Sequence, residues 1–365
     1  MIKILIFGVS FFILSKFISK FFRENKIHRL ITKYFDFIFI SNLPYFFILL
    51  MVFCWGMSLS YYSNENHGYS YFSFTFNYKD IGFFIGFLIL MFAINIRTRL
   101  DNLVILKEWG EDSNDIYNQK YKTNLNHLYT SPNFISPDLA NKFFKVYFII
   151  GGLLILVLEP KCLPLLLVYS LFNFFLHHKF IKTLSFNIFV LRCFFTLAML
   201  FLLFSSGWLY FGGNNVFDLF NYFPLFLMAV LPIILIYEIF SYENLTVDES
   251  NNRQFIIRNK KAISLAALLI MILLFYCSFF VYKDPILSHF SIITIPFLLY
   301  AYFRSQKKDF FRSFTYPIMV INILLSWTLF PLLFIVQFFI YYISKYYFWH
   351  RFENHFPTFL VEDSE

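Results

Sequence analysis

Residues 81–112, IGFFIGFLILMFAINIRTRLDNLVILKEWGED, pass without a break from an apolar run into a polar stretch that carries acids. No side chain before Arg97 in this stretch is ionisable, and Asp101, Glu108 and Asp112 follow. The apolar part approaches the roughly 20 residues that an α-helix needs to cross a bilayer. The stretch therefore predicts a transmembrane helix whose far end brings carboxylates to the membrane surface.

The composition of the whole chain indicates a membrane protein. Of its 365 residues 59% are hydrophobic and 14% are charged, and 57 are Phe. Soluble domains carry about 25% charged residues, so most of this apolar surface needs lipid as its solvent. The four cysteines are scattered and form no CxxC pair, so nothing indicates a disulfide framework. We expect an all-α, multi-pass protein of the cell membrane.

Apolar segments recur along the chain and predict about nine transmembrane helices. They lie at about 43–61, 81–97, 143–159, 163–178, 186–211, 223–241, 262–282, 286–303 and 314–345. Residues 1–28 are expected to form an amphipathic helix at the interface or an additional membrane helix, because Lys16 and Lys20 share one face of an apolar run. Residues 29–360 then form the transmembrane domain, and 361–365 form an acidic tail.

Basic residues are distributed unevenly between the two sets of alternate loops. Of the 30 Lys and Arg residues, 24 fall in one set and 5 in the other, with Lys3 left over. Cytoplasmic loops carry an excess of Lys and Arg, so the N-terminus of the nine-span unit is predicted to be cytoplasmic. The membrane also explains the basic residues better than nucleic acid does, because they lie in short loops and form no continuous face.

The acids after the second segment share one side of a helix. If the helix continues through residue 115, then Asp101, Glu108 and Asp112 fall within about 60° of each other around its axis. Like charges on one stripe repel each other. Arg97 lies on the same side and offsets part of this repulsion, and a divalent cation would offset more of it, since hard cations prefer oxygen ligands.

A second acidic stretch, IYEIFSYENLTVDE at 236–249, follows the sixth segment. Glu238 falls inside the apolar end of that segment, where an ionisable side chain is expensive and is a functional candidate. Glu243 comes next. Both acidic stretches are predicted to emerge on the cytoplasmic face, so they could converge on one site. The alternative for such polar loops is an ordinary solvated surface.

This layout resembles the UbiA superfamily of intramembrane prenyltransferases, and in particular a divergent UbiA-like branch. That branch carries Arg-x-x-Asp-Glu-x-Lys-Asp after its second span, where this chain has IRTRLDNLVILKEWGED. It carries Glu-Ile-x-Arg-Lys at the end of its sixth span, where this chain has YEIFSYENLTVDE. The resemblance covers about 29–360, although Asn102 stands where the branch has Glu, and Phe240 to Tyr242 replace the Arg-Lys part.

The resemblance implies an enzyme that transfers a prenyl group from a prenyl diphosphate to a lipophilic, membrane-associated acceptor, with Mg²⁺ as cofactor. The implied metal ligands are Asp101 and Glu238, and helix geometry adds other acids nearby. The full set of candidate ligands is Asp101, Glu108, Asp112, Glu238 and Glu243. Cations placed to meet the diphosphate oxygens are Arg97, Lys120, Lys122, Arg253 and Arg258.

Two alternatives stay open at this point. The chain could be a catalytically inactive UbiA-like membrane protein, since its motifs depart from those of the family. It could also be an unrelated multi-span transporter or polysaccharide polymerase. A transporter would place functional charges along a path at the midplane of the membrane, and a polysaccharide polymerase would place them in a long outer loop. The sequence has neither feature.

Overall fold

A computed structural model describes residues 43–64, 77–108, 137–176, 189–212, 216–243, 251–329 and 343 of the chain. These residues form helices joined by short turns, and no strand occurs among them. The long helices are α3 (Leu43–Asn64), α4 (Tyr78–Glu108), α7 (Pro137–Leu158), α8 (Leu163–Leu176), α10 (Phe189–Tyr210), α11 (Phe223–Glu243), α13 (Lys260–Tyr276), α14 (Pro285–Arg304) and α15 (Lys307–Leu329). Shorter elements are a 3-10 helix (Val216–Tyr222), α12 (Asn251–Arg258) and a π-helix (Cys277–Val281).

Each predicted apolar segment overlaps one of these long helices, and the all-α class is confirmed for the described part of the chain. Within that part, 6 helices are long and apolar enough to cross a membrane. Two shorter apolar helices, Leu49–Tyr61 and Leu163–Phe175, accompany them. A bundle of membrane-spanning helices is therefore present, whereas nine as the number of crossings stays a prediction.

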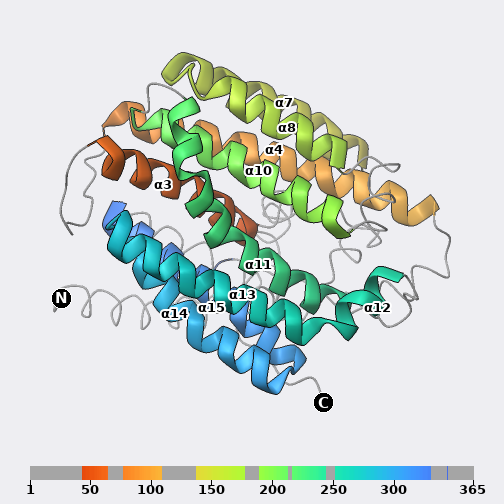
Figure 1. Ribbon diagram of the computed structural model, residues 1–365. Helices are drawn as coiled ribbons and strands as arrows, with labels where there is room; N and C mark the ends of the chain where they lie inside the picture. The colour runs from red at the N-terminus through yellow and green to blue at the C-terminus, as the bar shows by residue number, and fades with distance from the viewer. Residues whose placement is uncertain are drawn as a thin grey trace, which may run out of the picture.

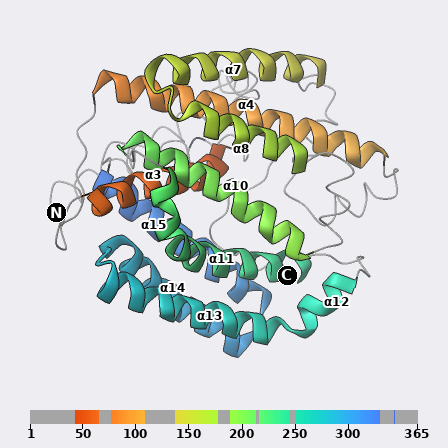
Figure 2. The same cartoon turned by 45° about the horizontal axis from the view of Figure 1, so that its top comes forward.

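The helices form two groups that α3 joins, as Figures 1 and 2 show. One group contains α4, α7, α8 and α10, with α4 packed along α7 and α8 along α10. The other contains α11, α13, α14 and α15, in which α11 packs on α13 and α15, and α14 on α13 and α15. Between the two groups, α3 contacts α10 on one side and α15 on the other. It contacts its neighbour in sequence, α4, less extensively.

The helix α3 occupies the interior of the bundle. Every described side chain from Val52 to Ser60 is buried, and this stretch covers more than two full turns. A helix at the periphery of a membrane protein exposes one face to lipid, so burial in all directions places α3 at the centre. The sequence of this stretch, VFCWGMSLS, has no charged residue and allows that position.

Aromatic side chains fill the space on both sides of α3. Towards α4, Phe53 packs against Phe83 and Phe87 with ring centroids 5.7 and 4.9 Å away. Towards α10 and α11, Trp55, Phe204 and Phe226 form a cluster that we call the aromatic plug, listed with its distances below. The centroids are 5.1 Å apart for Trp55 and Phe204, 5.1 Å for Phe204 and Phe226, and 5.7 Å for Trp55 and Phe226.

The two ends of the bundle differ in the segments that they carry. We call the end at which α4, α8, α11 and α14 finish the inner end, because the predicted cytoplasmic loops follow these helices. At the opposite, outer end, the Tyr210 hydroxyl donates a hydrogen bond to Asp80, which ties α10 to the start of α4. Close by, Lys79 pairs with Glu159 at 2.8 Å and ties α4 to the turn after α7. The outer end is thus held by polar contacts between three helices.

Candidate functional site

The two helices that precede the predicted acidic motifs finish at the same end of the bundle. Both views show the C-terminal ends of α4 and α11 at the inner end, on different sides of it (Figures 1 and 2). The positions of Asp101 and Glu108 fall in the last two turns of α4, and Glu243 is the last residue of α11. The chain therefore brings two acidic stretches that are distant in sequence to one end of the molecule.

Glu238 is directed into the protein. Its side chain is 4% exposed, while Tyr237, the preceding residue on α11, is 49% exposed. Burying a carboxylate among apolar side chains is costly unless a hydrogen bond or a cation compensates for the lost solvation. A buried carboxylate within a membrane helix is a candidate for a functional residue, and its role stays a prediction.

Polar side chains that sequence analysis did not select lie in the inner half of the bundle. Asn95 of α4 and Asn173 of α8 are 7% and 5% exposed. Thr98 donates a hydrogen bond of 2.6 Å to the Asn173 side-chain oxygen, which joins α4 to α8. The signal in the sequence was an Asn within each of two apolar runs, FAINI and SLFNFF. Together with Glu238, these residues place three buried polar side chains in the inner half of the bundle.

The basic residues predicted to bind the diphosphate belong to different segments of the chain. Arg97 is half-buried about three turns before the end of α4, and Arg258 is exposed at the end of α12, which also carries Arg253. Asp112, Lys120 and Lys122 lie outside the described residues. The convergence of these charges on a diphosphate accordingly stays a prediction.

The metal site also stays a prediction. The side chains described in the structure include no group of three His, Cys, Asp or Glu residues that could hold a metal ion. The predicted ligands are all carboxylates, and hard oxygen donors of this kind suit Mg²⁺. Glu238 alone among them is described down to its side chain, which is buried.

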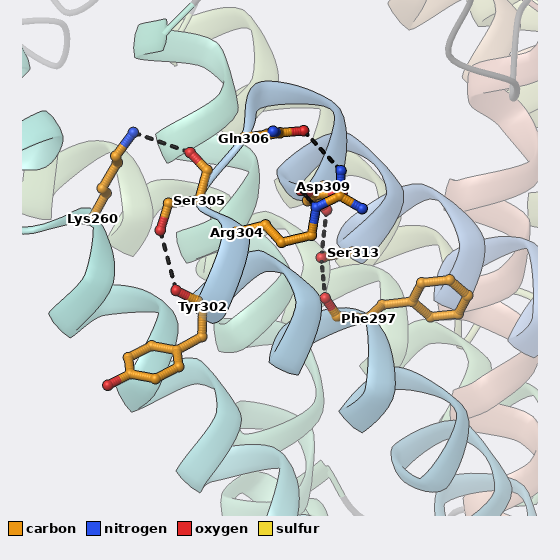
Figure 3. Close-up of polar contacts among 8 residues, drawn as sticks. All are labelled: Lys260, Phe297, Tyr302, Arg304, Ser305, Gln306, Asp309 and Ser313. Atoms are coloured by element: carbon orange, nitrogen blue, oxygen red, sulfur yellow. Dashed lines mark hydrogen bonds and ion pairs between the residues drawn. The ribbon is translucent and has the colours of Figure 1, made fainter.

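Polar contacts around the turn between α14 and α15 connect three helices at the inner end (Figure 3). Ser305 adopts the left-handed conformation, with φ of 51°, and ends α14. The ammonium group of Lys260, at the start of α13, donates to the Ser305 carbonyl oxygen at 3.2 Å. Arg304 pairs at 3.5 Å with Asp309, which is buried in the first turn of α15. These contacts hold α13, α14 and α15 together beside α11.

Comparison with solved structures identifies a similar fold. The chain is similar to a structure of digeranylgeranylglyceryl phosphate synthase, a UbiA-family prenyltransferase described in membranes, with a TM-score of 0.50 and 14% sequence identity. The likeness covers 82% of this chain and 98% of that one. No protein-family model matches the sequence, and no curated protein matches it either. The chain thus has a UbiA-like membrane prenyltransferase fold.

Proposed function

We propose that this chain, with its UbiA-like fold, is a membrane prenyltransferase that moves a prenyl group from a prenyl diphosphate to a lipophilic acceptor. The observation that carries the proposal is Glu238, a carboxylate buried at the end of α11 and at the same end of the bundle as the acidic end of α4. The structural neighbour, a digeranylgeranylglyceryl phosphate synthase, supports the same class of reaction.

In the proposed site the acids bind the metal and the basic residues orient the diphosphate. Asp101, Glu108 and Asp112 would act from one side, and Glu238 and Glu243 from the other. Mg²⁺, when bound, supplies the positive charge that neutralises the departing diphosphate. Arg97, Lys120, Lys122, Arg253 and Arg258 would contact the phosphate oxygens.

The buried interior supplies the remaining requirements of the reaction. The allylic C–O bond breaks and its electron pair leaves with the diphosphate, while the acceptor forms a bond to the same carbon and gives up a proton to the leaving diphosphate. Aromatic faces stabilise a developing cation where water is excluded. Buried aromatic side chains around α3 show that the interior of this protein excludes water.

A second candidate is a UbiA-like protein that binds lipid without catalysis. Phe240, Ser241 and Tyr242 stand where the UbiA-like branch has part of a basic motif, and Asn102 stands in place of an acid. An inactive relative would keep the fold and the apolar interior, and it would not release diphosphate.

Binding measurements with the Glu238→Gln variant test the proposal. Purified protein in nanodiscs is titrated with geranylgeranyl diphosphate, with Mg²⁺ and with a chelator. We expect Mg²⁺-dependent binding that falls at least tenfold in Glu238→Gln, because the amide cannot neutralise a cation. Glu159→Gln is the matched control, since Glu159 pairs with Lys79 at the outer end, and it should bind as the wild type does. Equal affinity in Glu238→Gln would remove this residue from the site and leave the proposal resting on the fold alone.

A further inference from the structure

Helix α7 lies at the edge of the bundle, as both views show (Figures 1 and 2). Within the described part of the chain it packs mainly on α4 and only slightly on α8. Its other sides expose apolar side chains along the membrane span Asp138–Leu158. Among them, Ile149, Leu153 and Leu156 are 60%, 55% and 48% exposed. Lipid is therefore the solvent for most of this helix.

Three charged side chains precede this apolar surface on the same side of α7. Asp138, Lys142 and Lys145 are exposed, and none of them forms an ion pair with a side chain that the structure describes. Ile149 and Leu156 continue the row, and the five positions fall within about 60° around the helix axis. This side of α7 thus carries charges at the inner end and apolar side chains from Ile149 onwards.

The order of the charges along the helix axis is specific. Lys142 and Lys145 lie next to the apolar part, and Asp138 lies one turn further from it, at the start of the helix. Positions 138 and 142 are about 6 Å apart along the axis. A phospholipid with an ammonium head group has the complementary order. Its phosphate lies next to the hydrocarbon chains, and its ammonium group follows across a bridge of two carbon atoms.

The same side of α7 has room for a hydrocarbon chain at Gly152, three residues after Ile149. No protein atom lies within 4 Å of the position that a Cβ of Gly152 would take. The neighbouring Gly151 differs, because its added Cβ would lie 2.7 Å from the backbone nitrogen of Leu90 on α4. Packing between helices thus accounts for Gly151, whereas Gly152 borders the lipid and lets an acyl chain approach the helix backbone.

We propose that this side of α7 binds a phospholipid whose head group carries a primary ammonium group, as in phosphatidylethanolamine. Lys142 and Lys145 bind the phosphate through charge-assisted hydrogen bonds. Asp138 accepts hydrogen bonds from the ammonium group, and an acyl chain lies along Ile149 and Gly152. The lipid is bound on the lipid-facing side of the bundle, so this site is separate from the site of the proposed function, and either can exist without the other.

Native mass spectrometry of the purified full-length protein measures the lipid preference. The protein in detergent is titrated with phosphatidylethanolamine, phosphatidylcholine and phosphatidylglycerol that have identical acyl chains. The first two carry the same net charge, but choline has no N–H group to donate to Asp138. We expect phosphatidylethanolamine to bind about two- to fivefold more tightly than phosphatidylcholine, which is the usual contribution of an exposed ion pair. Phosphatidylglycerol has no ammonium group and reports attraction to the lysines alone.

Variants at these exposed side chains assign the contacts. Asp138→Asn should lower the affinity for phosphatidylethanolamine to that for phosphatidylcholine and should not lower the affinity for phosphatidylglycerol. Replacing Lys142 and Lys145 together by Gln should weaken the binding of phosphatidylethanolamine roughly tenfold or more, because each basic residue beside a lipid phosphate contributes a factor of about five.

The matched control replaces Arg258 and Lys261 together by Gln. These two cations are exposed and have the same spacing at the start of α13, and residues 251–261 contain no acid. The control variant should therefore keep the preference for phosphatidylethanolamine. Equal binding of phosphatidylethanolamine and phosphatidylcholine to the wild type would overturn the assignment, and so would a preference that survives in Asp138→Asn. If the control variant loses the preference as well, the lipid responds to the positive charge of the inner end in general, and α7 has no site of its own.

Discussion

Gly56 of α3 and Gly207 of α10 face each other so closely that neither position has room for a methyl group. A Cβ on Gly56 would collide with the carbonyl oxygen of Phe204, and one on Gly207 with the carbonyl oxygen of Phe53. Small residues allow the backbones of membrane helices to approach in this way, and dispersion contacts along the crossing then stabilise the pair. The crossing anchors the central helix to the first group of helices.

Replacing Gly207 by Ala is expected to destabilise the protein. The added methyl group must push α3 and α10 apart, and overpacking of this kind costs about 1–3 kcal/mol. The measurement is thermal unfolding in detergent micelles, where the midpoint of Gly207→Ala should fall. Gly152→Ala is the control, because no atom lies within 4 Å of its added Cβ, and Ala is the better helix former. A Gly207→Ala midpoint equal to that of Gly152→Ala would show that the crossing is looser than described.

The Tyr210→Phe variant tests the hydrogen bond that joins α10 to α4 at the outer end. The Tyr210 hydroxyl bonds to Asp80, 130 residues away in the chain, and the Tyr210 ring stacks on Phe83 at 4.3 Å. The substitution keeps the stacking and removes the hydrogen bond, so we expect a loss of about 1–3 kcal/mol in the free energy of unfolding. Tyr276→Phe removes a hydroxyl from a residue that is 57% exposed and should leave stability unchanged. Equal stability in the two variants would show that the hydrogen bond between α4 and α10 does not stabilise the protein.

Asp284 is expected to make stability depend on pH. It caps α14, with Oδ1 accepting from the backbone N–H groups of Ile286 at 2.8 Å and Leu287 at 3.2 Å. Burial in the turn between α13 and α14 raises its pKa from 3.8 to about 6, against the opposing effect of these two hydrogen bonds. The folded state therefore holds the proton more tightly than the unfolded state. The contribution is fully present below about pH 4 and is lost as the pH rises to 6, by about 3 kcal/mol in total.

Unfolding of the Asp284→Asn variant between pH 4 and pH 7 checks this sign. Asn still caps the helix and does not titrate, so the fall in stability between pH 4 and pH 6 should become smaller. Above pH 6 the variant should be more stable than the wild type. A variant that follows the wild-type curve throughout would mean that Asp284 is not the group responsible.

Cysteine labelling tests the predicted orientation. Single cysteines are introduced at Asp248 and Lys283 in a background that lacks the four native cysteines. Position 248 follows the end of α11 in the sequence, and position 283 precedes the start of α14. Because α11 and α14 finish at the same end of the bundle, we expect the two positions on opposite faces of the membrane. A membrane-impermeant maleimide applied to intact cells should label position 283 and leave position 248 unlabelled. The reverse pattern would place the proposed site outside the cell and overturn the orientation drawn from the basic residues.

The helices were predictable from the sequence because each has its own apolar run. The helix from Tyr78 also continues into the polar stretch as far as Glu108, which agrees with the predicted extension up to that residue. The central position of α3 was not predictable. Its segment is as apolar as the others, and its burial depends on a contact between Gly56 and Gly207, which lie far apart in the chain.

The candidate site was predictable to a lesser extent. Glu238 stood out because a carboxylate within an apolar run has few structural explanations. Asn95 and Asn173 carry no charge and did not stand out, and the hydrogen bond between Thr98 and Asn173 joins positions 75 residues apart. The contact between Phe204 and Phe226 could not be inferred either, because they are two among 57 Phe residues until the fold brings them together.

The central position of α3 has a consequence for how the protein is made. Its two main contacts, α10 and α15, are synthesised long after it, and α15 begins only at Lys307. At the usual 5–20 residues per second, ribosomes need roughly 10–50 s to travel from α3 to α15. During that interval α3 lies in the bilayer without these two helices. It can do so because it has no charged residue from Leu49 to Ser60. Chains that stop before Lys307 would leave one side of α3 uncovered, and quality-control proteases of the membrane should recognise and remove them.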